Sequence, residues 1–239
     1  MLADTADGPF DDKNWLFEIK WDGYRAIAEI RNGEIDLYSR NRNSFNAKYP
    51  TIVSSLEKTD KDMILDGEIV VLNNEGKSDF NSLQNFGKTG ASRLFYYVFD
   101  ILYFDGKNLE NLPLSDRKEI LKNILPEFTN VRFNDHILKE GKAFYQLAKE
   151  KRLEGIIAKN IHSKYLTGKR SKEWLKLKIK KSQEAIIGGY TKPRGSREYF
   201  GALVLGVYNQ KNELEYIGHT GGGFAEDDLK EIYKKMEPL

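Results

Sequence analysis

The chain has 239 residues, 40% of them hydrophobic, so it can bury a substantial core as one large domain or two smaller ones. Its 38 basic and 36 acidic residues leave a net charge of only +2, which does not by itself indicate a polyanionic partner. The absence of cysteine excludes disulfides and thiolate metal sites, and His136, His162 and His219 are too far apart in sequence to suggest a zinc site. No stretch has the roughly 20 apolar residues that span a bilayer, and no signal-peptide pattern is present, so we expect a soluble, intracellular protein.

The first predicted elements are strands. Residues 15–39 contain two alternating apolar and polar runs, and Asn32-Gly33 is a hairpin signal before the next run, so we expect an antiparallel meander. Lys20 stands at the end of one strand, and Gly23 turns the chain back towards Arg25. This arrangement is compatible with a nucleophile beside an anion-binding side chain, but also with a surface hairpin whose charged side chains are merely solvated.

Further strands and a helix follow in the middle of the chain. Residues 49–58 have helical spacing, and strands are predicted over 63–73 and 94–104. Phe99 in the last strand could stack on a nucleotide base, although for this residue taken alone a core position is the favoured explanation. Gly87-Lys88-Thr89 resembles the end of a phosphate-binding loop, but residue 82 is serine where such a loop needs glycine, so we interpret it as a loop without that function.

Two helices then precede two more strands. Ser115 is the predicted N-cap of a helix through Leu125, and a second helix is predicted over 139–151, before strands over 154–160 and 173–180. Glu68 and Glu154 each stand at the border of an apolar strand. Two convergent carboxylates would suit Mg²⁺ in a phosphoryl-transfer site, whereas each alone could be a solvated strand end.

The strand over 173–180 carries a pair of lysines. Lys176 and Lys178 are two residues apart, so both side chains point to one face, where they could neutralise a triphosphate. The surrounding stretch, residues 164–181, has eight basic residues against one acidic residue, Glu173. This asymmetry favours contact with a phosphate backbone, the alternative being solvated surface charge.

From about residue 182 the pattern becomes rich in strands. Alternating runs at 184–191, 202–209 and 213–220 are separated by turn residues, and an amphipathic helix follows over 227–236. We predict a second domain, which at this size is small for independent stability and could be an incomplete barrel.

In their order and composition these motifs resemble the nucleotidyltransferase motifs of ATP-dependent DNA ligases. The matching segments are residues 20–25 (KWDGYR), 39–40 (SR), 66–68 (DGE), 97–100 (YVFD), 154–159 (EGIIAK) and 174–178 (WLKLK). Within that family, the amino-acid sequences of these motifs are similar to those of the ligase domain of bacterial ligase D, an end-joining enzyme.

The resemblance implies that Lys20 attacks the α-phosphorus of ATP, that AMP then passes to a DNA 5′-phosphate, and that the 3′-hydroxyl displaces it to seal the nick. The implied catalytic residues are Lys20, Arg25, Lys176 and Lys178. The implied nucleotide-binding residues are Glu18, Ile19, Lys20, Arg25, Arg40, Glu68, Phe99, Glu154, Lys159, Trp174, Lys176 and Lys178, and Glu68 and Glu154 are implied to hold Mg²⁺ or Mn²⁺.

The implied fold is α+β. It comprises an antiparallel-sheet nucleotidyltransferase domain (ATP-grasp-like ligase domain) over 1–181, followed over 182–239 by the N-terminal part of an oligonucleotide-binding (OB) fold barrel. The implied partners are nicked or broken double-stranded DNA, the Ku end-binding protein and fused polymerase or phosphoesterase domains, with a monomer acting at the bacterial nucleoid in the cytoplasm. The basic motif that normally closes the ligase barrel is not found, so we expect a truncated barrel and a weakened reaction with ATP.

Two other functions remain open at this point. An RNA ligase or an mRNA-capping guanylyltransferase would share the nucleophilic lysine, both glutamates and the paired lysines. A non-catalytic nucleic-acid-binding module would use the basic strand and partial barrel, and would form no covalent adduct.

Overall fold

The structure is a computed structural model that describes residues 1–87, 93–125, 130–179 and 182–237; Lys88 and Thr89 of the phosphate-loop-like segment lie outside these ranges. The chain divides into two compact units, Met1–Ile179 (unit 1) and Lys180–Leu239 (unit 2), so the boundary lies two residues before the predicted one. Within the described ranges, no helix is long and apolar enough to cross a membrane.

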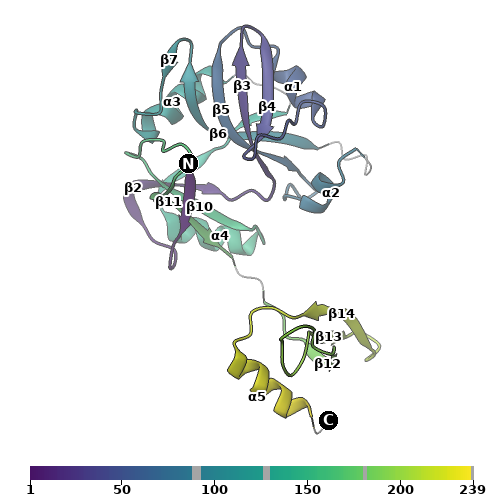
Figure 1. Cartoon of the computed structure of the whole chain (residues 1–239). Helices are drawn as coiled ribbons and strands as arrows, with labels where there is room; N and C mark the ends of the chain where they lie inside the picture. The colour runs from purple at the N-terminus through teal and green to yellow at the C-terminus, as the bar shows by residue number, and fades with distance from the viewer. Residues whose placement is uncertain (88–92, 126–129, 180–181, 238–239) are drawn as a thin grey trace. The chain divides into compact units, whose positions relative to one another are not determined.

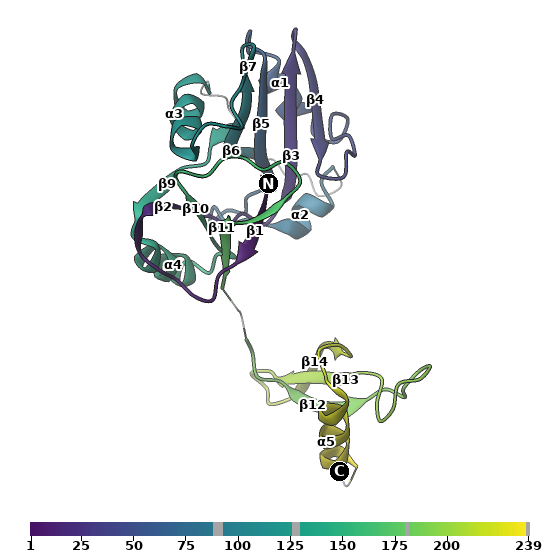
Figure 2. The same ribbon diagram turned by 60° about the vertical axis from the view of Figure 1, so that its left-hand side comes forward.

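Unit 1 contains a five-stranded sheet, here called sheet A. Its strands, in spatial order, are β1 (Leu2–Thr5), β11 (Arg170–Lys178), β10 (Gly155–Asn160), β2 (Asp12–Ile19) and β9 (His136–Lys139). Helix α4 (Gly141–Glu150) covers one face, where Ala148 packs into a buried cluster with Phe17 and Ile156 (Figure 2). The opposite face of sheet A is therefore left for contacts with the rest of unit 1.

The second sheet of unit 1, sheet B, contains the other strands described before residue 180. Its order is β4 (Glu34–Ser39), β3 (Tyr24–Arg31), β5 (Met63–Val71), β6 (Leu94–Phe104) and β7 (Lys107–Asn108), with β8 (Val131–Phe133) also paired to β6 (Figure 1). Alternate residues of β3 are fully buried, among them Ala26 and Ala28, and they join the largest core cluster. Helices α1 (Pro50–Leu56), α2 (Phe80–Gln84) and α3 (Leu114–Ile124) complete this part of the unit.

The predicted meander over residues 15–39 is only half correct. Strands β3 and β4 form the hairpin that Asn32-Gly33 indicates, with Arg31 opposite Glu34. Strand β2, however, pairs with β9 and β10 in sheet A, because residues 20–23 carry the chain from one sheet to the other. The crossing requires Gly23, since a Cβ there would lie 2.2 Å from the carbonyl oxygen of Ile69.

Three further predictions need correction. The sheets are not wholly antiparallel, because β1 pairs in parallel with β11 and β8 with β6. Helix α3 begins one residue before Ser115, and its N-cap is Pro113, which has no side-chain hydrogen bond to the helix. Glu68 lies within β5 rather than at the start of a strand, whereas Glu154 does directly precede β10.

The two sheets of unit 1 meet around a small apolar cluster. Trp174 of sheet A and Leu102 of sheet B pack there with Tyr165, which belongs to the segment between β10 and β11. The Tyr165 hydroxyl donates a 2.7 Å hydrogen bond to Asp66 of β5. The segment therefore ties the two sheets together beside the predicted site.

Unit 2 consists, in its described part, of a three-stranded antiparallel sheet and one helix. The strands are β12 (Ile186–Tyr190), β13 (Leu203–Tyr208) and β14 (Leu214–Thr220), and helix α5 spans Glu226–Met236. Phe200, Leu203 and Leu229 form its buried core. These elements confirm the strands and helix predicted for the tail.

Candidate active site

Lys20 lies at the point where the chain leaves sheet A. Strand β2 ends at the preceding residue, and the Lys20 backbone N–H donates a 3.0 Å hydrogen bond to the carbonyl oxygen of Gly155. Its ammonium is paired with the carboxylate of Glu154, and both side chains remain partly exposed. Residues 134 positions apart in sequence are thus brought into direct contact.

Gly155 fixes the position of Glu154. Its φ angle is +151°, and a Cβ at this position would lie 2.2 Å from the carbonyl oxygen of Leu177 in the neighbouring strand. Any side chain at residue 155 would push β10 away from β11. The glycine after Glu154 is therefore required for close packing of the strand that carries the carboxylate.

Arg25 and Glu68 face the same region from sheet B, where they are directly opposite each other on β3 and β5. The Arg25 guanidinium binds the buried carboxylate of Asp66 with two hydrogen bonds, Nε–Oδ1 at 2.9 Å and Nη2–Oδ2 at 2.5 Å. Burial raises the pKa of Glu68 to about 8, although Arg25 and Lys20 oppose the shift. A rigid cation and a carboxyl that is readily protonated near neutral pH therefore lie side by side.

These residues surround a cavity of about 160 Å³ between the two sheets, here called the lysine cavity. It is lined by Ala3, Glu18, Ile19, Lys20, Trp21, Arg25, Glu68, Phe99, Asn134, Ile157, Lys159 and Trp174. Eight of the predicted nucleotide-binding residues are in that set. Phe99 and Trp174 give the cavity an aromatic wall, their ring centroids being 6.0 Å apart in an edge-to-face arrangement.

The inner end of the lysine cavity holds a buried group of three charges. Glu18 accepts from Lys118 at 2.7 Å and lies 2.7 Å from the ammonium of Lys159. Burial alone would raise the pKa of Glu18, but the two lysines outweigh it and lower the pKa below its usual value. Burial lowers the pKa of Lys159, whose ammonium lies 4.3 Å from the Phe99 ring centroid.

The paired lysines of β11 lie on the face predicted for them. In the register with β10, Trp174 is opposite Lys159 and Lys176 is opposite Ile157, so the alternate residues of β11 share the face that borders the lysine cavity. The Lys178 ammonium lies 3.8 Å from the Glu154 carboxylate. Lys178 is thus beside the Lys20–Glu154 pair, and Lys176 stands one position further along the strand face.

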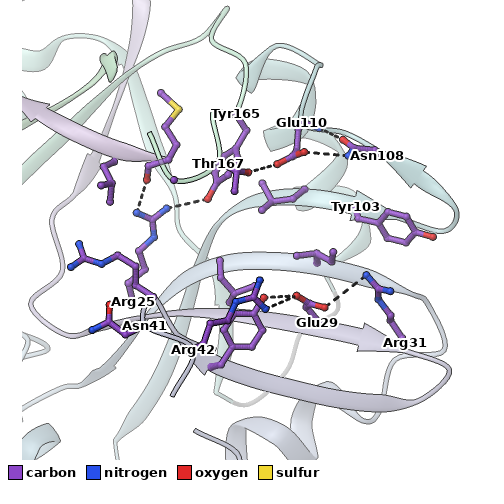
Figure 3. Close-up of a pocket in the computed structure, with 18 residues that line it drawn as sticks. Arg25, Glu29, Arg31, Asn41, Arg42, Tyr103, Asn108, Glu110, Tyr165 and Thr167 are labelled. Atoms are coloured by element: carbon purple, nitrogen blue, oxygen red, sulfur yellow. Dashed lines mark hydrogen bonds and ion pairs between the residues drawn. The ribbon is translucent and has the colours of Figure 1, made fainter. Parts of the chain in front are cut away.

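Arg40 is not part of the lysine cavity. It lines a second and larger cavity, about 660 Å³, on the exposed face of sheet B, here called the arginine cavity (Figure 3). Arg25 borders both cavities. Arg31 and Arg42 also line the arginine cavity, and each lies 3.8 Å from Glu29.

Sequence reasoning missed several residues of this site, chiefly Lys118, Asn134 and Trp21. A signal for Lys118 does exist, because Leu114, Arg117, Lys118 and Leu121 follow the spacing of one helix face, and all four are buried. Two basic residues between leucines on a buried face indicate partners in the interior. No comparable signal exists for Asn134, which lies in a loop after the short strand β8.

The chain matches two protein-family descriptions over most of its length. The family described as "ATP dependent DNA ligase domain" matches residues 1–178, and the one described as "ATP dependent DNA ligase C terminal region" matches residues 196–239. The chain belongs to the ATP-dependent DNA ligase family. The resemblance seen in the motifs is thereby confirmed.

Relatives within the ligase family include the multifunctional non-homologous end joining protein LigD of Pseudomonas aeruginosa, 36% identical over 231 residues. That match covers 94% of this chain but only 27% of the LigD protein, so the chain spans about a quarter of that relative's length. The DNA ligase-like protein LigB of the Bacillus subtilis SPbeta prophage is 37% identical over 194 residues, or 80% of this chain and 71% of LigB.

Solved ligase structures share the fold. The ligase domain of LigD from Mycobacterium tuberculosis matches all of this chain with a TM-score of 0.69 at 30% identity, which covers 77% of that domain structure. A mycobacterial DNA ligase D complexed with ATP and MES gives the same values. Chlorella virus DNA ligase-adenylate, at 20% identity and a TM-score of 0.54, supports the fold alone.

Proposed function

We propose that this chain is the catalytic core of a DNA-joining enzyme that carries AMP on Lys20. The observation that carries the proposal is the Lys20–Glu154 pair at the lysine cavity, with Arg25 and Glu68 on the facing sheet. Unit 1 serves as the adenylation domain, and unit 2 as the N-terminal part of an OB-fold domain. Membership of the ligase family supports this assignment.

The proposed reaction has three group transfers. The Lys20 amine attacks the α-phosphorus of ATP, a nitrogen–phosphorus bond forms, and the bond to pyrophosphate breaks. An oxygen of the DNA 5′-phosphate then attacks the same phosphorus, which returns the electron pair to Lys20. Finally, the 3′-hydroxyl attacks the activated 5′-phosphate and AMP leaves. Covalent catalysis divides one difficult displacement into easier steps.

The charges around Lys20 fit these transfers. An ammonium has no lone pair, so Lys20 must give up a proton before it attacks, and the Glu154 carboxylate already accepts its hydrogen bond. We propose that Arg25, Lys176 and Lys178 neutralise the negative charge that accumulates on the phosphates. Fixed cations in a partly water-excluded cleft stabilise such a transition state.

The described residues include no cluster of three or more His, Cys, Asp or Glu side chains that could hold a metal ion, so a divalent cation in this cleft would depend on phosphate oxygens as well as on protein carboxylates. We propose that Glu68 and Glu154 hold Mg²⁺ or Mn²⁺, because they supply two carboxylates beside the nucleophile and such ions complete their coordination with phosphate oxygens and water. When bound, the cation neutralises phosphate charge.

The inner end of the lysine cavity suits a purine. Phe99 and Trp174 offer aromatic surface to the base, and Glu18, Lys159 and the backbone at Ile19 lie where its polar edge would be read. ATP rather than GTP is the proposed donor. The adenine therefore lies deep between the sheets, with the triphosphate directed towards Lys20.

The arginine cavity suits the nucleic acid. We propose that Arg40 contacts the ribose or the DNA 5′-phosphate because it lines this cavity, and Arg25 borders both cavities. Because the relatives are named for non-homologous end joining, we propose that the natural protein joins broken DNA in end joining. On the motif resemblance alone, we propose Ku and fused polymerase or phosphoesterase domains as its partners.

A sealing assay tests the proposed function. Nicked duplex DNA with a 5′-phosphate is incubated with Mg²⁺ and either ATP or GTP, beside Lys20→Ala and a nicked RNA duplex. We expect the wild-type protein to seal DNA with ATP but not with GTP, and we expect no sealing by Lys20→Ala. Sealing of RNA in preference to DNA, or use of GTP, would favour the alternative nucleotidyltransferases. Salt-sensitive DNA binding without any joining would favour the binding module.

A further inference from the structure

Lys118 is a buried cation that the reaction described above does not use. It lies on α3, and its side chain is only 3% exposed. The ammonium donates to Glu18 at 2.7 Å and to the carbonyl oxygen of Asn134 at 2.7 Å, and it lies 4.2 Å from the ring centroid of Phe133. The short distances and the burial show that Lys118 is an interior residue rather than a surface lysine.

The two acceptors of Lys118 connect it to the residues on either side of the nucleophile, Glu18 directly and Asn134 through a hydrogen bond to Trp21. Glu18 precedes Lys20 by two residues on β2. The side chain of Asn134 accepts a 2.8 Å hydrogen bond from the indole N–H of Trp21, the residue after Lys20, and Trp21 is stacked on Tyr97 with ring centroids 4.2 Å apart. One ammonium group on a helix thus fixes the chain on both sides of the nucleophile.

The charges around Glu18 show why a single lysine would not keep this buried carboxylate ionised. Glu18 is fully enclosed, and its two oxygens face two different cations, Oε1 facing Lys118 and Oε2 facing Lys159. A buried carboxylate that loses one of two cations tends to take up a proton, and its remaining partner is drawn closer to it. Loss of Lys118 would therefore change both the charge state of Glu18 and the position of Lys159.

We propose that Lys118 is a positioning residue for the base end of the lysine cavity, which holds Glu18 ionised and in place so that the site selects adenine. This inference rests on the proposed function. An ionised carboxylate only accepts hydrogen bonds, and with two of its roughly four lone-pair sites taken by lysines it can still accept from the 6-amino group of adenine. The same carboxylate repels the 6-oxygen of guanine, whereas a protonated Glu18 could donate to it.

The test compares Lys118→Met with Lys118→Arg, and with Lys122→Met as the matched control, because Lys122 is exposed on the same helix. Formation of the Lys20 adduct is measured over a range of ATP and GTP concentrations. We expect Lys118→Met to raise the KM for ATP by on the order of 10-fold, with a much smaller change in kcat, and to narrow the preference for ATP over GTP. Lys118→Arg should recover most of the preference, and Lys122→Met should match the wild type.

A second pair of variants tests the same point without the unpaired buried carboxylate that Lys118→Met creates. Glu18→Gln and the double variant Glu18→Gln/Lys118→Met leave no unpaired carboxylate in the interior. If Lys118 acts through Glu18, the double variant has the same ATP-to-GTP ratio as Glu18→Gln alone. Additive losses in that ratio would overturn the inference. So would a Lys118→Met protein that unfolds at a lower temperature but keeps the wild-type preference.

Failure of the proposed function gives a different result. In that case the wild-type protein forms no Lys20-dependent adduct with any nucleotide. The comparison is then made by protection of the same variants against thermal unfolding by ATP and by GTP. Greater protection by ATP that disappears in Lys118→Met supports the role of Lys118, and equal protection by both nucleotides in the wild type contradicts it.

Discussion

Replacement of Arg117 by methionine should strongly destabilise unit 1. Arg117 and Asp100 are fully buried and joined by two hydrogen bonds, Nε–Oδ1 at 2.8 Å and Nη2–Oδ2 at 2.9 Å. Arg117 also donates to the carbonyl oxygens of Leu112 at 2.6 Å and Ser163 at 3.0 Å. Without Arg117, the Asp100 charge keeps only the backbone N–H of Ile101 as a donor among the described contacts. Breaking such a pair costs about 3–5 kcal/mol, a large part of the roughly 5–15 kcal/mol that stabilises a typical domain.

Urea unfolding followed by tryptophan fluorescence measures this loss in unit 1 alone. All three tryptophans, Trp15, Trp21 and Trp174, lie in that unit. The exposed control Lys122→Met should change the free energy of unfolding by no more than about 0.5 kcal/mol. The double variant Arg117→Met/Asp100→Leu should be more stable than the single one, because no unpaired charge remains. A loss below about 1 kcal/mol, or a double variant no better than the single, would refute the reasoning.

Three further predictions concern the site. Gly155→Ala should reduce the rate of Lys20 adduct formation by at least about 100-fold, because the added Cβ meets the Leu177 carbonyl and displaces Glu154. A labelling time course measures this rate, and a near-wild-type rate would contradict the prediction. The folded pKa of Glu68, about 8, exceeds its ordinary value of 4.5, so the stability of the ligand-free, metal-free protein should fall as pH rises from about 4.5 to 8. Denaturant midpoints across that range should show the fall, and Glu68→Gln should lose this component. Arg40→Ala should form the Lys20 adduct at a rate within a few-fold of the wild type but should lose sealing of a pre-adenylated nick, because Arg40 lines the arginine cavity. Equal losses in both steps would indicate that Arg40 contacts the nucleotide instead.

Local signals were sufficient for much of the fold. The β3–β4 hairpin follows from Asn32-Gly33, and the long apolar run over Leu94–Phe104 forms β6 with the predicted bounds. Strand β1 could not be predicted from its own four residues, because its structure depends on parallel pairing with β11, more than 160 residues later. The placement of β2 in sheet A likewise depends on distant partners rather than on the neighbouring β3.

For the site, too, some residues could be predicted from the sequence and others could not. Lys20, Glu154 and Lys178 were predicted from motif resemblance, and the structure brings them together at the ends of three strands, β2, β10 and β11. The residues that hold those side chains in place were harder to find. Lys118 belongs to a helix with many charged residues, and only its spacing from Leu114 and Leu121 on one helix face indicates that it is buried. Arg40 was predicted to contact the ribose or the DNA 5′-phosphate, and a linear motif does not show that its side chain lines the arginine cavity rather than the lysine cavity.

The central claim, a covalent nucleotide on Lys20, is tested most directly by mass spectrometry. The purified protein is incubated with Mg²⁺ and ATP labelled at the α-phosphate, and the labelled peptide is sequenced beside a Lys20→Ala sample. The proposed function predicts one AMP adduct on Lys20, its loss in Lys20→Ala, and its release when nicked DNA is added. Label on another residue, or no covalent label while nicked DNA is still sealed, would contradict it.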